Sequence, residues 1–125
     1  MQRMFLLAGA LAGLVGVAFG AFGAHGLRGR LSPEMLAVFE TGVRYQMYHA
    51  LALMLTAALS TMSMSRPTGG RAVAAAGWLF VAGIVLFSGS LYVLAVTGLT
   101  VFGAITPIGG VAFLLGWACL AFATL

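Results

Sequence analysis

The chain alternates long apolar segments with short polar connections. Apolar residues run almost without interruption from Met4 to Ala24, about residues 4–24, and further apolar segments cover about residues 45–64, 72–96 and 101–124. A hydrocarbon core about 30 Å thick needs roughly 20 helical residues at 1.5 Å per residue. Each segment is therefore long enough to cross a bilayer. The pattern predicts an all-α integral membrane protein with four transmembrane helices, folded as a single domain over residues 1–125.

A short extra helix is expected between the first and second spans. Residues 32–34, Ser-Pro-Glu, have the features of a helix start: a capping serine, a proline at the first helical position and an acid in the first turn. Glu40 and Arg44 lie four residues apart, in the order that favours an ion pair. We expect residues 33–44 to form an amphipathic interfacial helix that bends into the second span near Gly42.

Glycines recur in the first span with a period of 3.5 residues, at Gly9, Gly13, Gly16, Gly20 and Gly23. Small residues on one face let helices approach closely in lipid, and this period implies a left-handed crossing. We expect a close-packed helix interface here; a pore or ligand groove lined by glycine is the alternative. The segment also resembles a signal peptide, but its apolar run exceeds the roughly 7–15 residues of that class.

Polar and helix-breaking residues interrupt the last two spans. Ser88 and Ser90 put hydroxyl groups at membrane depth, and Pro107 removes a backbone hydrogen bond, so we expect it to kink or break the fourth span. The hydroxyls of Ser88, Ser90 and Thr106 are expected to satisfy freed backbone groups or to bridge spans. Broken helices also line transporter sites, but the sequence has neither an intramembrane acid nor an inverted repeat to support transport.

Composition and charge agree with a membrane protein. The 125 residues are 62% hydrophobic and only 6% charged, against about 25% charged residues in an ordinary soluble domain. All six basic residues are arginines, scattered between apolar segments, and the net charge is +4. We interpret them as topology signals and lipid-phosphate contacts rather than as a nucleic-acid site. Membrane lipid is the expected partner, with another membrane protein or a second copy of the chain as further candidates.

Most of the ionisable side chains, including both histidines and both acids, lie between residues 25 and 49. His25 closes the first span and His49 opens the second, so both are expected at one membrane face. The predicted polar cluster contains His25, Glu40, Tyr45, Gln46, His49, Ser88, Ser90 and Tyr92. Interfacial anchoring and hydrogen bonding between helices are the simplest roles for these residues, and a lipid or small-ligand pocket is the alternative.

The same residues do not form a recognisable catalytic or metal site. Two histidines and Glu40 are too few for a metal centre, and no motif supports a haem held by two histidines. No nucleophile or oxyanion site accompanies a His–Glu pair. Cys119 lies inside an apolar run and supports neither a disulfide nor a metal site. No catalytic residue, metal ligand or cofactor is predicted.

Several motifs occur in a characteristic order along the chain. They are Gly-Ala-Phe-Gly-Ala-His at 20–25, Thr-Gly-Val-Arg-Tyr-Gln-Met-Tyr-His-Ala-Leu-Ala at 41–52, Leu-Phe-Ser-Gly-Ser-Leu-Tyr at 86–92, Thr-Pro-Ile-Gly-Gly at 106–110 and Gly-Trp at 116–117. Together they resemble the domain-of-unknown-function family 423, small bacterial inner-membrane proteins related to animal transmembrane protein 256. The resemblance implies a four-span inner-membrane protein without an established activity.

Two functional hypotheses follow. The first is a non-enzymatic membrane component that packs with lipid or with a partner membrane protein. The second is a small transporter, channel or ligand-binding module that uses the polar face formed by His25 and His49. With four spans, the two sides of the membrane carry equal numbers of arginines. The free N-terminal amine then favours placing both termini in the cytoplasm.

Overall fold

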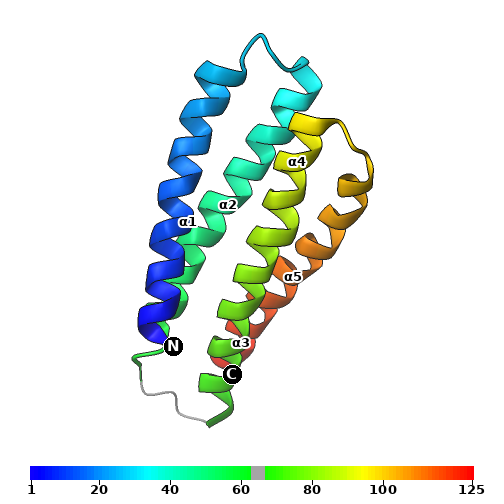
Figure 1. Ribbon diagram of the computed structural model, residues 1–125. Helices are drawn as coiled ribbons and strands as arrows, with labels where there is room; N and C mark the ends of the chain where they lie inside the picture. Colours follow the sequence, from blue (N-terminus) through cyan, green and yellow to red (C-terminus); the bar gives the residue numbers. More distant parts are fainter. Residues whose placement is uncertain (63–66) are drawn as a thin grey trace.

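A computed structural model describes residues 1–62 and 67–125 as a bundle of long helices packed side by side (Figure 1). The elements in chain order are α1 (Gln2–Phe22), the π-helical turn η1 (Gly23–Leu27), α2 (Pro33–Leu59), α3 (Pro67–Gly83), the π-helical turn η2 (Ile84–Ser88), α4 (Gly89–Thr97) and α5 (Val101–Ala123). Every element named in these two ranges is helical, which confirms the all-α fold class. The two chain termini lie at the same end of the bundle (Figure 1).

Three stretches of the described residues are long and apolar enough to cross a membrane. They are Gln2–Leu27, Thr68–Thr97 and Val101–Ala123, which correspond to the first, third and fourth predicted spans. The stretch Thr68–Thr97 includes α3, η2 and α4, which follow one another directly. The last residues of the second predicted span, 63 and 64, and the loop residues 65 and 66 lie outside the described residues.

Helix α2 joins two segments that the sequence led us to expect as separate. Its predicted start is confirmed, because the side chain of Ser32 accepts a hydrogen bond from the backbone N–H of Met35 at 3.2 Å. The helix then continues for 27 residues without a break at Gly42. Gly42 instead packs against the ring of Tyr92, where an added Cβ would lie 2.8 Å from Cε1. The expected interfacial helix and the first part of the expected second span therefore form one helix.

Pro107 does not break α5. The helix runs from Val101 to Ala123 with the proline inside it, so of the two expected effects, a kink or a break, the break does not occur. The preceding residue supports the backbone here, since the hydroxyl of Thr106 donates a hydrogen bond to the carbonyl of Phe102 at 3.2 Å. The irregular turn lies instead in the neighbouring helix at η2, which the sequence pattern did not reveal.

The glycine-rich face of α1 lies against α2. Four of its five glycines have α2 side chains or backbone as their nearest neighbours: Gly9, Gly16, Gly20 and Gly23. At Gly9 an added Cβ would lie 2.8 Å from the carbonyl oxygen of Ala50, so the two backbones approach each other closely. Gly13 differs, because no heavy atom outside its own helix lies within 4 Å of an added Cβ.

Aromatic rings resting on glycines connect the other helices. The pairs are Phe5 on Gly77, Phe80 on Gly116, Phe113 on Gly83 and Tyr92 on Gly42. Because lipid tails are as apolar as the side chains they would replace, helices in a bilayer associate through close contact rather than through burial from water. A glycine has no side chain, so an aromatic ring can approach its backbone closely and increase that contact. Phe5 and Phe80 are completely enclosed as a result.

The outer face of α1 carries large apolar side chains. Leu6, Leu7, Leu11, Leu14 and Val17 are all exposed. On a soluble protein a continuous apolar face of this size would be an aggregation hazard. In a bilayer the same face lies against lipid tails.

Candidate functional site: the His49 cavity

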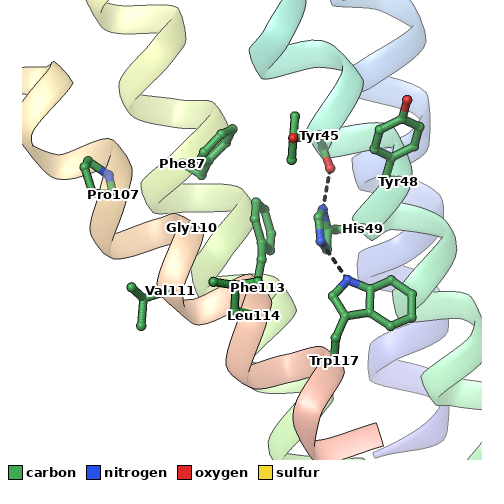
Figure 2. A pocket seen from close by; sticks show the side chains of 10 residues that line it. All are labelled: Tyr45, Tyr48, His49, Phe87, Pro107, Gly110, Val111, Phe113, Leu114 and Trp117. Carbon is green, nitrogen blue, oxygen red and sulfur yellow. Dashed lines mark hydrogen bonds between the residues drawn. The ribbon is translucent and has the colours of Figure 1, made fainter. Parts of the chain in front are cut away.

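His49 lies inside the bundle and uses both of its ring nitrogens. Its Nδ1 lies 2.7 Å from the backbone carbonyl oxygen of Tyr45, one turn earlier in α2. Its Nε2 accepts a hydrogen bond from the indole N–H of Trp117 in α5 at 3.2 Å. Figure 2 shows both interactions. The side chain of His49 thus connects α2 to α5, although the two residues are 68 positions apart.

These two partners determine the protonation state of the imidazole. A carbonyl oxygen can only accept, so the hydrogen must be on Nδ1. The indole nitrogen can only donate, so Nε2 must carry its lone pair. His49 is therefore the neutral Nδ1–H tautomer, which suits a ring that is only 4% exposed in an apolar environment.

The flat face of His49 stacks on Phe113. The ring centroids are 3.4 Å apart and the planes differ by 8°. Phe80 and Trp117 complete the aromatic surroundings, with ring centroids 5.5 and 6.2 Å from that of His49. The imidazole is held by two hydrogen bonds and by rings on several sides, so it has little freedom to reorient.

A cavity of about 610 Å³ opens beside this histidine, between α2, η2 and α5. Its lining is aromatic and apolar and has only a few polar atoms. The residues that line it are Tyr45, Tyr48, His49, Phe87, Pro107, Gly110, Val111, Phe113, Leu114 and Trp117 (Figure 2). Tyr48, Val111, Leu114 and Trp117 are each exposed. The cavity therefore opens sideways, onto the outer surface of the bundle.

The cavity lies near the middle of the helices rather than at their ends. Phe113, which stacks on His49, is close to the midpoint of α5. One turn before His49 in α2, Gln46 reaches the backbone of Ala12, which is near the midpoint of the Gln2–Leu27 stretch. Tyr45 and Tyr48 thus lie near the middle of α2 rather than near its ends.

Gln46 forms a second polar connection through the bundle. Its side-chain Nε2 donates to the carbonyl oxygen of Ala12 in α1 at 2.8 Å, and its Oε1 accepts from the hydroxyl of Tyr92 in α4 at 2.7 Å. One buried amide thus joins α1, α2 and α4. Such bonds are worth about 0.6–2 kcal/mol each between membrane helices.

The two serines of the third predicted span have different environments. The hydroxyls of Ser90 and of Thr106 in α5 lie 2.7 Å apart, and each also lies within hydrogen-bond distance of a carbonyl, Phe87 for Ser90 and Phe102 for Thr106, so two hydrogens are shared among three contacts. Ser88 is completely enclosed at the end of η2, and its hydroxyl has no hydrogen-bond partner among the described residues. Ser90 therefore bridges two helices, whereas Ser88 does not.

The expected polar cluster is divided in the structure. His25 lies in η1 and is exposed, as is Glu40 on α2. His49 lies about 24 Å along α2 from its first residue, Pro33, at 1.5 Å per residue. The groups that contact the His49 ring come from α2, α3 and α5. The structure does not bring the two histidines together, because α2 carries His49 far from the connection beside His25.

Among the cavity residues that the sequence did not assign to a site are Phe87, Phe113 and Trp117. Trp117 belongs to the Gly-Trp motif, which was the available signal, but nothing in the motif pointed to a histidine partner. Within residues 1–62 and 67–125, no group of three or more His, Cys, Asp or Glu side chains is placed to hold a metal ion.

Comparison with known proteins agrees with the fold and the sequence motifs. A 116-residue alignment to the UPF0382 membrane protein YwdK of Bacillus subtilis is 49% identical and covers 93% of this chain and 91% of that protein. The UPF0382 membrane protein SAUSA300_0565 of Staphylococcus aureus strain USA300 is 50% identical over 124 residues, covering 98% and 96% of the two chains. No solved structure matches.

Both of these relatives are described as membrane proteins, in keeping with the exposed apolar faces and the three long apolar helices. The sequence model of the family described as "Protein of unknown function (DUF423)" matches residues 19–110. This range contains the predicted polar cluster, both π-helical turns and Pro107. The chain is therefore a membrane protein that belongs to the DUF423 family.

Proposed function

We propose that this protein is a non-enzymatic, four-span component of the bacterial inner membrane that binds an apolar, lipid-phase molecule in the His49 cavity. The observation that carries the proposal is the cavity itself: an aromatic space of about 610 Å³ at mid-depth that opens sideways. A molecule dissolved in the bilayer can enter such a space without passing through water. A volume of this size is typical of ligand sites.

Binding is favoured over catalysis by the state of His49. A general base needs a free nitrogen within reach of a substrate proton, but both nitrogens of this ring already have partners within the protein. The polar groups left at the cavity edge are the hydroxyls of Tyr45 and Tyr48. The expected ligand is therefore a hydrocarbon chain or ring with at most one or two hydrogen-bonding oxygens.

Tryptophan fluorescence gives a direct test of the cavity. In a Trp78→Phe variant, Trp117 at the cavity edge is the sole tryptophan. A fatty acid brominated along its chain, added to the protein in detergent, is expected to quench this fluorescence saturably, because bromine quenches on contact. Introducing Val111→Phe in this background narrows the cavity and is expected to weaken the binding.

Ile108→Phe is the matched control for this test. Ile108 is an exposed, β-branched residue on α5 like Val111, but it does not line the cavity. The proposal would be contradicted by quenching that rises without saturation, or by equal effects of the two substitutions. If the fatty acid does not quench the fluorescence and two chains can be chemically cross-linked, a protein partner at this face would be favoured instead.

The four-span arrangement requires α2 to cross the membrane. This helix packs along α1 after a five-residue connection, residues 28–32, so it returns across the same thickness. Its 27 residues extend roughly 40 Å. The polar side chains that lower its hydropathy include Gln46, His49 and Thr56, all of which are buried. Lipid would therefore meet mostly apolar atoms along the middle and end of α2, while its first turns lie at headgroup level.

Both termini are expected in the cytoplasm, with the connection between α1 and α2 on the periplasmic side. A reporter that is active only in the cytoplasm should therefore be active when fused after Leu125. An Arg28→Cys variant should react with a membrane-impermeant thiol reagent in intact cells whose outer membrane has been permeabilised. Labelling of this cysteine only after the inner membrane is lysed would reverse the orientation. A reporter result that places the N- and C-termini on opposite sides would contradict four spans.

A further inference from the structure

A second depression lies on another face of the bundle, between α1, η1 and α2. This α1–α2 groove has a volume of about 300 Å³. Phe19, Gly20 and Gly23 line one side, and Phe39 and Val43 line the other. Unlike the His49 cavity, it also has two charged residues on its border, Glu40 and Arg44.

The floor of the α1–α2 groove is apolar, and two of its residues, Gly20 and Gly23, have no side chain. An added Cβ at Gly20 would lie 3.4 Å from Cγ1 of Val43, and one at Gly23 would lie 3.1 Å from Cδ1 of Phe39. The α2 side chains thus rest directly on the backbone of the first span. The surface between the helices is shaped to accept a hydrocarbon chain lying along them.

Glu40 and Arg44 carry opposite charges one helical turn apart, yet they do not pair with each other. Both are exposed, and neither side chain forms an ion pair or a hydrogen bond with any residue in the described ranges. The order, acid before base at a spacing of four, is the one that normally favours a pair. An acceptor and a donor are therefore both available at the border of an apolar groove.

These two charges lie toward the end of the bundle where α1 ends and α2 begins, and the long side chain of Arg44 can extend from its deeper position toward the headgroups. Gly20 and Gly23 lie close to the end of the Gln2–Leu27 stretch, which is about 39 Å long, whereas the hydrocarbon core is about 30 Å thick. The groove is consequently near the boundary between acyl chains and headgroups. Arg44 lies deeper along α2, and Glu40 lies nearer the membrane surface.

The charges of a zwitterionic phospholipid follow the same order in depth as those of Arg44 and Glu40. The phosphate, next to glycerol, is deeper and meets Arg44, while the terminal ammonium is farther out and meets Glu40. We propose that the α1–α2 groove binds a phospholipid with a primary-amine headgroup, phosphatidylethanolamine. A primary ammonium can donate hydrogen bonds to the carboxylate of Glu40. The quaternary ammonium of phosphatidylcholine has no N–H to donate, and phosphatidylglycerol has no cation.

The test is competition between lipids that differ only in headgroup. The full chain in detergent is titrated with dioleoyl phosphatidylethanolamine, phosphatidylcholine and phosphatidylglycerol, and bound lipid is counted by native mass spectrometry. We expect roughly tenfold tighter binding of the ethanolamine lipid than of the choline lipid, the effect of one charge-assisted hydrogen bond. Glu40→Gln should abolish this preference, and Arg44→Gln should weaken both lipids alike.

The chain offers matched controls for both charges. Glu34→Gln removes the other acid of the protein, in the first turn of α2 and outside the groove, and should leave the preference intact. Arg30→Gln should leave the affinity for both lipids unchanged. Equal binding of the two zwitterionic lipids by the parent, strongest binding of phosphatidylglycerol, or equal losses in Glu34→Gln and Glu40→Gln would each overturn the proposal. Val111→Phe, in the His49 cavity, should not alter the headgroup preference, so the two proposed sites can fail independently.

Discussion

Gly109→Ala is expected to lower the stability of the bundle by about 1–3 kcal/mol, the usual cost of forcing extra atoms into a packed interior. Gly109 faces the irregular turn η2, and a Cβ there would lie 2.8 Å from both the Cα of Phe87 and the carbonyl carbon of Leu86. These are backbone atoms and cannot rotate away. The substitution must therefore push α5 and η2 apart, which thermal unfolding in detergent, followed by circular dichroism, will detect.

The neighbouring glycine provides the control. A Cβ at Gly110 would lie 3.7 Å from Cδ2 of Phe87, which is ordinary van der Waals contact. Alanine also favours the helix over glycine by about 0.5–1 kcal/mol. Gly110→Ala should therefore be neutral or stabilising. If the two adjacent substitutions had equal effects, the close approach of α5 and η2 would be wrong.

Trp117→Phe is expected to cost about 1–2 kcal/mol, although it retains an aromatic ring. The indole N–H is the donor to Nε2 of His49, and phenylalanine has no N–H to replace it. The imidazole is buried, so its lone pair would be left without a partner, at a cost in this range. Chemical unfolding in detergent with increasing sodium dodecyl sulfate measures this loss.

A double-mutant cycle separates the hydrogen bond from packing. His49→Phe combined with Trp117→Phe removes both partners, so the double variant should be less destabilised than the sum of the singles. His25→Ala is the control, since His25 is exposed in η1, and should change stability little. If the effects of His49→Phe and Trp117→Phe on stability were additive, the hydrogen bond between the two side chains would not be coupling them. If the effects of His25→Ala and His49→Ala were non-additive, the two histidines would not be separate as the structure places them.

Much of the local structure follows from the sequence because it depends on neighbouring residues. The apolar run after Met4, the capping serine at residue 32 and the helix breaker Gly98 each act within a few positions. Gly98 ends α4 with a left-handed backbone, φ 71°, which glycine adopts without strain. The glycine period of the first span likewise predicted a close helix contact, and four of the five glycines lie against α2.

The candidate site depended on contacts that the sequence pattern does not encode. In water, apolar periodicity separates the inside of a bundle from its surface, but in lipid both sides of a helix are apolar. Phe113, which stacks on His49, and Leu114, which is 71% exposed, are therefore indistinguishable by hydrophobicity. The membrane environment removes the signal that would have identified the cavity-lining residues.

The sequence by itself determined the class of protein, the positions of the long apolar helices and the start of α2, because these follow from composition, length and short-range spacing. Only the tertiary structure decided which polar groups meet. Gln46 reaches α1 and α4, and His49 reaches Trp117 in α5, because of how the helices are placed and rotated against one another. That placement is set by rings resting on glycines far away in the chain, such as Phe80 on Gly116. Chain order alone put His49 beside His25, whereas the continuous length of α2 carries it to the middle of the bundle.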